Sequence, residues 1–187
     1  MCNIDSYVAK ILEALEQRGG APIIGINGLD CAGKTTLAQV LQQQLITSGV
    51  HAELMHVDDF NDLSVQKRVY SAYCDGEFTK DLFEQYYRSS VDYAALQDAI
   101  QVTRERKNGP IIVEGVFLYR PPLADLFDVK VFLMVPYEVA RKRYAARKIQ
   151  AGDDRPIQVF DEIWVPAYER YCREFSPDKA ADLIFEM

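Results

Sequence analysis

The chain has 187 residues, a length that suits one domain with a full hydrophobic core. Hydrophobic residues make up 49% of it, which excludes a disordered chain, and no apolar run reaches the roughly eighteen residues that span a membrane. The net charge of −7 argues against a general nucleic-acid binder, which would usually be basic.

The N-terminal segment and the cysteines predict a cytoplasmic protein. Acidic residues at Asp5, Glu13 and Glu16 interrupt the first segment, which therefore lacks the apolar stretch of a secretory signal. The four cysteines are scattered and form no C-x-x-C pair of the kind used for zinc binding or redox chemistry. They are Cys2, Cys31, Cys74 and Cys172. Free thiols in a reducing compartment are the simplest interpretation.

Two helices and two strands are predicted in the first sixty residues. Apolar residues share one face of a helix over residues 3–18, which stops at Gly19-Gly20, and an apolar strand through Ile23–Ile26 follows. The next helical pattern runs to about Ser48. A second strand, over about residues 52–57, leads into acidic residues.

The region after the second strand, residues 62–107, reads as helical with breaks. One helix ends at Cys74, a second spans about residues 79–88, and a third begins at Tyr93. The strand over residues 111–113 is wholly apolar, as expected for a parallel strand with both faces covered.

The last third of the chain predicts two strands, two helices and a loop. In order, these are a strand over 129–135, a cation-rich helix over 137–148, a mobile loop over 152–156, a helix over 158–175 and a strand over 182–185. Strands that alternate with helices imply a parallel sheet with right-handed crossovers and helices on both faces. The sequence therefore predicts one α/β domain over residues 1–187.

Gly28 to Thr35 reads G-x-x-x-x-G-K-T, the phosphate-binding loop pattern, between the first strand and a helical pattern. Its two glycines let the backbone turn tightly, so that N–H groups and the start of the next helix face an anion. Lys34 then reaches the β- and γ-phosphates, and the Thr35 hydroxyl ligates Mg²⁺. The alternative is a glycine-rich turn that binds nothing, but the flanking strand and helix favour a nucleoside triphosphate site.

Two predicted strands end in acidic residues, at the edge of the sheet where ligands bind in parallel α/β folds. Asp58 and Asp59 follow the second strand, and Glu114 follows the third. A carboxylate beside an apolar strand is costly unless a cation or hydrogen bonds compensate it, and Lys34 and Mg²⁺ would do so. The alternatives are that one aspartate only caps the next helix and that Glu114 is a solvated strand end.

The cation-rich helix is a candidate for phosphate binding. Its cations are Arg141, Lys142, Arg143, Arg147 and Lys148. Arg143 and Arg147 lie four residues apart, so they share a helical face and could converge on phosphates. The loop directly after them could act as a lid that excludes water from bound ATP. The alternative is an exposed basic face.

The ordered motifs resemble those of uridine kinases and nicotinamide riboside kinases over most of the chain. They are Gly25–Thr36, Asp58-Asp59-Phe60, Glu114-Gly115 and the Arg141–Arg147 helix. The later part, Pro136-Tyr137-Glu138 through Trp164-Val165-Pro166-Ala167-Tyr168, looks particularly like nicotinamide riboside kinases. The loop motif alone specifies only a nucleotide-binding superfamily, whereas the ordered set is much more specific.

The resemblance implies a P-loop nucleoside triphosphate hydrolase fold, with a five-stranded parallel sheet of order 2-3-1-4-5 and a lid over about residues 141–156. By motif position, Asp58 matches the catalytic base, and Glu114 matches the acidic residue near Mg²⁺ or the acceptor. The expected catalytic residues are Asp58, Lys34, Glu114 and Arg143, and the expected Mg²⁺ ligands are Thr35, Glu114 and Asp58. The residues expected to contact ATP are Gly28, Asp30, Cys31, Ala32, Gly33, Lys34, Thr35, Thr36, Arg143 and Arg147.

The chain departs from the family where the acceptor is chosen. The family's ribose-binding aspartate has no clean match, and Asp92 is the candidate; the aromatic position that stacks nicotinamide is Ile149. No histidine occurs between Asp92 and Glu114, where uridine kinases carry one. Aromatic residues between the second and third strands could form the acceptor pocket or simply pack helices together. They are Phe60, Tyr70, Tyr73, Phe83, Tyr86 and Tyr87.

These expectations describe a kinase that uses ATP and Mg²⁺ to phosphorylate a hydroxyl of a small nucleoside-like acceptor, with no nucleic acid or membrane partner. The alternatives are a kinase of another metabolite, such as a sugar or a vitamin precursor, and a nucleotide-dependent regulatory ATPase. The guanine-reading N-K-x-D motif that a GTPase switch would usually carry does not occur in the sequence. The sequence leaves four points open: the identity of the acceptor, the preference for ATP or GTP, the oligomeric state, and whether Asp58 or Asp59 is the base.

Overall fold

The computed structural model describes residues 4–18, 21–106 and 108–187. Its centre is a five-stranded sheet in which all neighbouring strands are parallel. The strands are β1 (Ile23–Gly28), β2 (Glu53–His56), β3 (Ile111–Gly115), β4 (Val129–Met134) and β5 (Leu183–Glu186). Their order in the sheet, β2-β3-β1-β4-β5, confirms the predicted topology.

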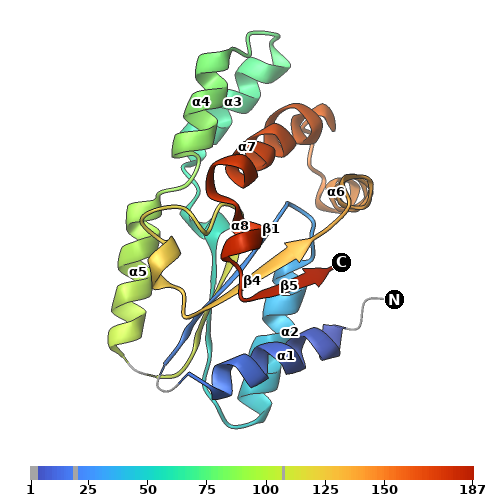
Figure 1. Cartoon of the computed structure of the whole chain (residues 1–187). Helices are drawn as coiled ribbons and strands as arrows, with labels where there is room; N and C mark the ends of the chain where they lie inside the picture. Colours follow the sequence, from blue (N-terminus) through green and yellow to red (C-terminus); the bar gives the residue numbers. More distant parts are fainter. Residues whose placement is uncertain (1–3, 19–20, 107) are drawn as a thin grey trace.

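Helices cover both faces of the sheet (Figure 1). They are α1 (Ile4–Glu16), α2 (Lys34–Thr47), α3 (Leu63–Cys74), α4 (Lys80–Ser89), α5 (Tyr93–Glu105), α6 (Tyr137–Ala151), α7 (Val165–Phe175) and α8 (Pro177–Ala180), with short turns η1 (Val57–Phe60), η2 (Ala124–Leu126) and η3 (Phe160–Trp164). The apolar residues of α1 and α2 pack on one face, and those of α5 and α7 pack on the other. The α3–α4 pair projects beyond the sheet, at the same end as α6 and α7 (Figure 1).

The central strand β1 is buried along its whole length. Ile24 and Ile26 belong to the apolar cluster shared with α1 and α2, whereas Ile23 belongs to the cluster shared with α5. A parallel strand with both faces covered needs apolar residues at successive positions, which explains the unbroken apolar run in the sequence. The loops that follow β1 and its neighbour β3 are therefore anchored in a fully packed core.

Two predicted helices show features in the structure that the sequence pattern did not indicate. α6 continues to Ala151, beyond its predicted end at Lys148, and Gly152 ends it with a left-handed φ of 63°. The helix predicted over residues 158–175 is confirmed as a continuous helical run, which contains the π turn η3 after its first two residues. Pro166 lies in the first turn of α7 and lacks the N–H that an α-helical bond would use, so the chain takes the wider turn before it.

Within the described residues, no helix combines the length and apolar character that crossing a membrane requires. Cys31, Cys74 and Cys172 are unpaired thiols. Cys2, residue 3 of the predicted first helix, its stop at Gly19-Gly20 and residue 107 of the predicted helical region lie outside the described residues.

Candidate active site

The loop between β1 and α2 is held in shape by its own hydrogen bonds. Gly33, directly before α2, has a φ of 97°, a left-handed conformation that glycine adopts without strain. The Ala32 N–H donates to the Leu29 carbonyl at 3.1 Å, and the Lys34 ammonium donates to the same oxygen at 2.9 Å. The loop thus wraps the N-terminus of α2, where free backbone N–H groups favour an anion.

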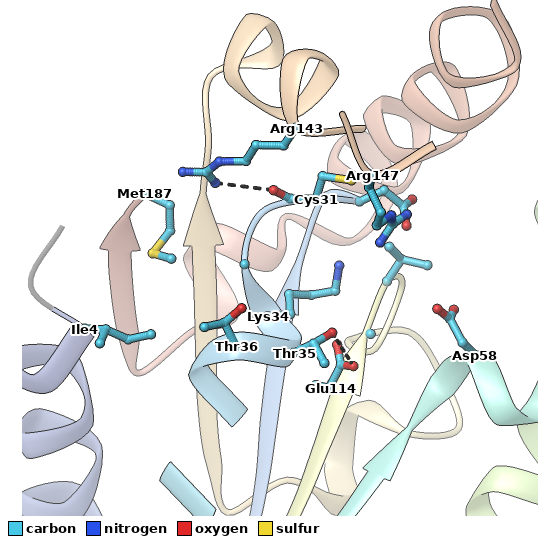
Figure 2. Close-up of a pocket in the computed structure, with 14 residues that line it drawn as sticks. Ile4, Cys31, Lys34, Thr35, Thr36, Asp58, Glu114, Arg143, Arg147 and Met187 are labelled. Carbon is cyan, nitrogen blue, oxygen red and sulfur yellow. Dashed lines mark hydrogen bonds between the residues drawn. The ribbon is translucent and has the colours of Figure 1, made fainter. Parts of the chain in front are cut away.

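A cavity of about 570 Å³, here called the phosphate cavity, lies over this loop (Figure 2). Its lining consists of Ile4, Asp30, Cys31, Gly33, Lys34, Thr35, Thr36, Asp58, Glu114, Gly115, Val116, Arg143, Arg147 and Met187. The residues expected to contact ATP all line it except Gly28 and Ala32. A Cβ added to Gly28 would lie 2.8 Å from the Leu133 carbonyl oxygen, and Ala32 is buried in the core. These two residues therefore shape the loop, and their side-chain positions face away from the ligand.

Thr35 and Glu114, which line this cavity, form a hydrogen-bonded group with His56, which lies outside the lining. The Thr35 hydroxyl donates to Glu114 Oε1 at 2.9 Å, and His56 Nδ1 lies 2.7 Å from the same oxygen. His56 reaches Glu114 because the two residues are direct partners in the register of β2 and β3. The buried Glu114 carboxylate is therefore oriented from two sides. No sequence motif points to His56, since its contact depends on how two strands align.

The oxygens of Thr35 and Glu114 fit a magnesium ion. Hydroxyl and carboxylate oxygens are ligands that Mg²⁺ prefers, and this ion commonly binds through one or two protein groups together with substrate phosphates. Across the residues that the structure describes, no group of three His, Cys, Asp or Glu side chains gathers into a complete metal site. Thr35 and Glu114 would therefore hold Mg²⁺ jointly with the phosphates of a nucleotide.

Asp58 faces the cavity from the end of β2. The strand stops at His56, before its predicted end at residue 57, because the chain turns there into the 3-10 helix η1. Figure 2 shows the Asp58 carboxylate across the cavity from Thr36, and Asn61 Nδ2 donates to it at 3.4 Å. The side chain is exposed, so its carboxylate is accessible to a ligand.

The aspartate that caps the next helix is neither Asp58 nor Asp59. Asp62 caps α3, since its carboxylate accepts hydrogen bonds from the Ser64 N–H at 3.0 Å and the Val65 N–H at 3.1 Å. The alternative that Asp58 or Asp59 only caps a helix is therefore wrong. The neighbouring Asp59 is also exposed but does not line the cavity.

The cations of α6 divide between two tasks. Arg143 lies over the loop and donates to the Cys31 carbonyl at 3.3 Å (Figure 2), and Arg147 lines the same cavity. Arg141 instead forms a two-bond ion pair with Asp161, with Nε–Oδ1 at 2.8 Å and Nη2–Oδ2 at 2.9 Å. This pair attaches α6 to η3. Arg143 and Arg147 are both exposed and both line the cavity, so their common helical face is as predicted, and their binding of phosphates stays a prediction.

A second attachment joins α6 to η3 through aromatic rings. The Tyr144 ring stacks on Phe160 with centroids 5.2 Å apart and planes inclined by 16°. It also lies 4.9 Å from the Trp164 ring. Tyr144 and Phe160 are fully buried, so these contacts are part of the core and not of the surface.

A second cavity, of about 210 Å³ and here called the acceptor cavity, adjoins the first. Asp30, Asp58, Val116 and Arg147 line both cavities. The further lining of the acceptor cavity consists of Asn61, Gln66, Tyr70, Tyr86, Ser90, Val91, Phe117, Arg155 and Trp164. Asp58 therefore stands where the two cavities meet.

The predicted aromatic region supplies only part of the acceptor cavity. Tyr70 and Tyr86 line it, and Trp164, from outside that region, completes the wall by donating its indole N–H to the Tyr70 hydroxyl at 2.9 Å. Burial raises the pKa of Tyr70, so its hydroxyl stays protonated near neutral pH. The other predicted rings pack against the core, namely Phe60, Tyr73, Phe83 and Tyr87.

Arg155 and Asp92 have different roles from those predicted. Arg155, expected in a mobile loop, lies in the wall of the acceptor cavity, with its guanidinium carbon 5.1 Å from the Tyr70 ring centre and 5.0 Å from that of Trp164. Asp153 holds it there, with Oδ2 at 2.7 Å from Nη2. Asp92, the candidate for ribose binding, instead caps α5 and does not line the cavity.

Comparisons with known proteins agree with this geometry. A family model described as an AAA domain matches residues 24–164. Nicotinamide riboside kinase 2 of Homo sapiens is 32% identical over 172 residues, which cover 81% of this chain and 68% of the human protein. The uridine kinase of Leuconostoc citreum is 27% identical over 173 residues, which cover 84% and 82%. A solved structure of a possible uridine kinase from Bacillus stearothermophilus has a TM-score of 0.69 at 25% identity, covering 97% of this chain and 96% of that one.

Proposed function

The chain belongs to the family of P-loop small-molecule kinases that includes uridine kinases and nicotinamide riboside kinases, and from this premise we propose its reaction. It is a phosphotransferase that transfers the γ-phosphoryl group of ATP to a hydroxyl of a small nucleoside-like acceptor. The observation that carries the proposal is the junction of the phosphate cavity and the acceptor cavity at Asp58. A phosphoryl group held in the first cavity would meet a hydroxyl held in the second.

We assign the phosphate side of the reaction to Lys34, Arg143, Arg147 and the backbone of the loop. Phosphoryl transfer passes through a loose transition state with negative charge spread over the equatorial oxygens, and cations fixed around that charge lower the barrier. When bound, Mg²⁺ would neutralise phosphate charge, with Thr35 and Glu114 as its protein ligands.

We assign the base to Asp58. Its carboxylate takes the proton of the acceptor hydroxyl while that oxygen bonds to the γ-phosphorus and the bond from phosphorus to the ADP oxygen breaks. The family resemblance also implies Asp58 as an Mg²⁺ ligand, and its position where the two cavities meet supports the role on the acceptor side. Because it is accessible and caps no helix, Asp58 is available for proton transfer.

We propose a single domain over residues 1–187. Within it, residues 141–156, which include most of α6 and the loop after it, form the lid. Two contacts support this proposal. Arg143 reaches the phosphate-binding loop from α6, and Arg155 forms part of the acceptor wall. Closing this segment would exclude water from both cavities, and this protects ATP from hydrolysis.

An acceptor screen tests the proposal. ADP release from MgATP is measured with uridine, nicotinamide riboside, ribose, pantothenate and no acceptor. We expect uridine or nicotinamide riboside to stimulate ADP release well above the rate without acceptor, and the phosphorylated product to appear in equal amount. Equal ADP release with and without every compound would instead support the regulatory ATPase.

A further inference from the structure

We propose that Asp30 binds the acceptor: its carboxylate accepts a hydrogen bond from a second hydroxyl of the same molecule and thereby selects ribosides over their deoxy forms. This inference rests on the proposed kinase function. It moves Asp30 from the nucleotide, where the phosphate-binding loop motif placed it, to the acceptor. It also supplies the sugar contact that Asp92 does not make.

The position of Asp30 is the first argument. It belongs to the loop after β1, yet it lines the acceptor cavity as well as the phosphate cavity, as Asp58 does from the end of β2. The loop on either side of it is fixed, because Cys31 adopts a left-handed φ of 61° and the Ala32 N–H bonds back to Leu29 at 3.1 Å. The two carboxylates therefore stand in defined places at the junction of the cavities.

The unused bonding capacity of Asp30 is the second argument. Its side chain is partly buried, and in the part of the chain that the structure describes no hydrogen bond or ion pair satisfies its carboxylate. Lys34, the cation with the largest compensating effect on Asp30, donates to the Leu29 carbonyl instead. Burial raises the pKa of Asp30, while Lys34 and Arg147 act in the opposite direction. A desolvated carboxylate of this kind is stabilised by a ligand that brings a hydroxyl donor.

Other roles fit Asp30 less well. A carboxylate repels a phosphate group, so Asp30 is unsuited to hold the nucleotide itself. It does not combine with Asp58 and Glu114 into a metal site, since no such group of three occurs among the described residues. The rest of the acceptor cavity offers amide and hydroxyl groups from Asn61, Gln66 and Ser90. A polar cavity with two carboxylates at its mouth suits an acceptor that carries several hydroxyls.

The test compares discrimination between hydroxyl and deoxy acceptors, a ratio that does not depend on overall activity. The value of kcat/KM is measured for uridine, 2′-deoxyuridine and 3′-deoxyuridine, and for nicotinamide riboside, with wild type, Asp30→Asn and Asp30→Ser. Wild type should prefer the riboside over one of its deoxy forms by about 10–100-fold, the value of a hydrogen bond to a charged group. Both variants should lose most of that preference. Without the Asp30 carboxylate, the extra hydroxyl of the riboside no longer gains a strong hydrogen bond, so the riboside and its deoxy form are used almost equally well.

The outcomes separate this inference from the function on which it rests. If wild type phosphorylates none of these compounds, the proposed function fails and the inference fails with it. If wild type phosphorylates a riboside and both deoxy forms equally well, or if the variants keep the full preference, only the inference is overturned. An equal fall in kcat for every acceptor, with the preference unchanged, would make Asp30 part of the transfer chemistry and would also overturn it. If both variants fail to fold, the wild-type measurement still applies, and the absence of a preference for the riboside overturns the inference.

Discussion

The phosphate cavity and the acceptor cavity meet at Asp58 but are built in different ways. The phosphate cavity takes most of its polar lining from one short loop and from the ends of two adjacent strands. The acceptor cavity takes its walls from segments far apart in the chain, among them Tyr70 of α3, Tyr86 of α4, Arg155 after α6 and Trp164 of η3. Every nucleoside triphosphate presents the same phosphates, so local recognition suffices there. Acceptors differ, and the dispersed walls can vary without disturbing the loop.

Substitution of Asp58 tests whether the phosphate cavity and the acceptor cavity act separately, and it has the largest expected effect. Asp58→Asn keeps the shape of the side chain but cannot take a proton, so kcat should fall by about 10²–10⁴. ATP should still raise the Tm, because the phosphate side is intact and any ligand of the folded state stabilises it. Asp59→Asn is the matched control, since Asp59 is equally exposed and does not line the cavity. If Asp59→Asn lost activity and Asp58→Asn kept it, the two aspartates would exchange roles.

Lys34 tests the phosphate side alone. Lys34→Ala removes a cation near the transferred group, and kcat/KM should fall by about 10²–10³. ATP should no longer raise the Tm of the variant. The Tm without ATP is recorded as well, because Lys34 also bonds to the Leu29 carbonyl inside the loop. Lys142→Ala, which removes an exposed cation of α6, should behave like wild type. Unchanged stabilisation of Lys34→Ala by ATP would disprove the assignment.

The arginines of α6 sharpen the comparison because they border different cavities. Arg143→Ala should lower kcat by about 10–100-fold with little change in the KM of the acceptor, since its charge matters most as the phosphoryl group moves. Arg147→Ala should lower kcat and also raise that KM, because Arg147 lines both cavities. Arg141→Ala breaks the Asp161 pair and should cost at most about 1 kcal/mol of stability. If the steady-state constants of all three variants stay close to those of wild type, the arginines form only an exposed basic face and do not bind the phosphates.

Substitution of Asp153 should change stability without a direct effect on the transfer step, and it concerns only the acceptor side. Hydrogen bonds from Arg155 lower the pKa of Asp153 to about 2. Since this value lies below that of an unfolded aspartate, about 4, the carboxylate stabilises the fold above pH 4 and loses this contribution as the pH falls toward 2. Asp153→Asn should therefore unfold about 1–2 kcal/mol more easily at pH 7 and show a smaller deficit at pH 3. Urea denaturation over this pH range measures the difference, and a deficit independent of pH would contradict the linkage.

The sequence predicted what depends on neighbouring residues. The G-x-x-x-x-G-K-T pattern located the loop because its glycines, Lys34 and Thr35 act within a single turn of chain. Glu114 was found because the end of an apolar strand marks one edge of a parallel sheet. The sheet order itself followed from the family resemblance and is confirmed by the structure.

What the sequence could not predict depends on distances across the fold. His56 meets Glu114 through the alignment of β2 with β3, and Arg155 lies over both Tyr70 of α3 and Trp164 of η3, which contact each other. Neither contact has a characteristic spacing along the chain. Asp92 illustrates the converse, since its place in the sequence predicts a sugar contact, whereas in the structure it caps α5.

The attachment of α6 to η3 has a thermodynamic consequence. α6 carries Arg143 above the phosphate-binding loop, and the buried Tyr144 ring of the same helix packs against Trp164, which lines the acceptor cavity. Any rotation of α6 that improves contact with a nucleotide must therefore shift that wall. Thermodynamic linkage then requires that the nucleotide and the acceptor change each other's affinity by the same factor. The two substrates would thus influence each other through a shared helix, in addition to their direct contact at the transferred phosphoryl group.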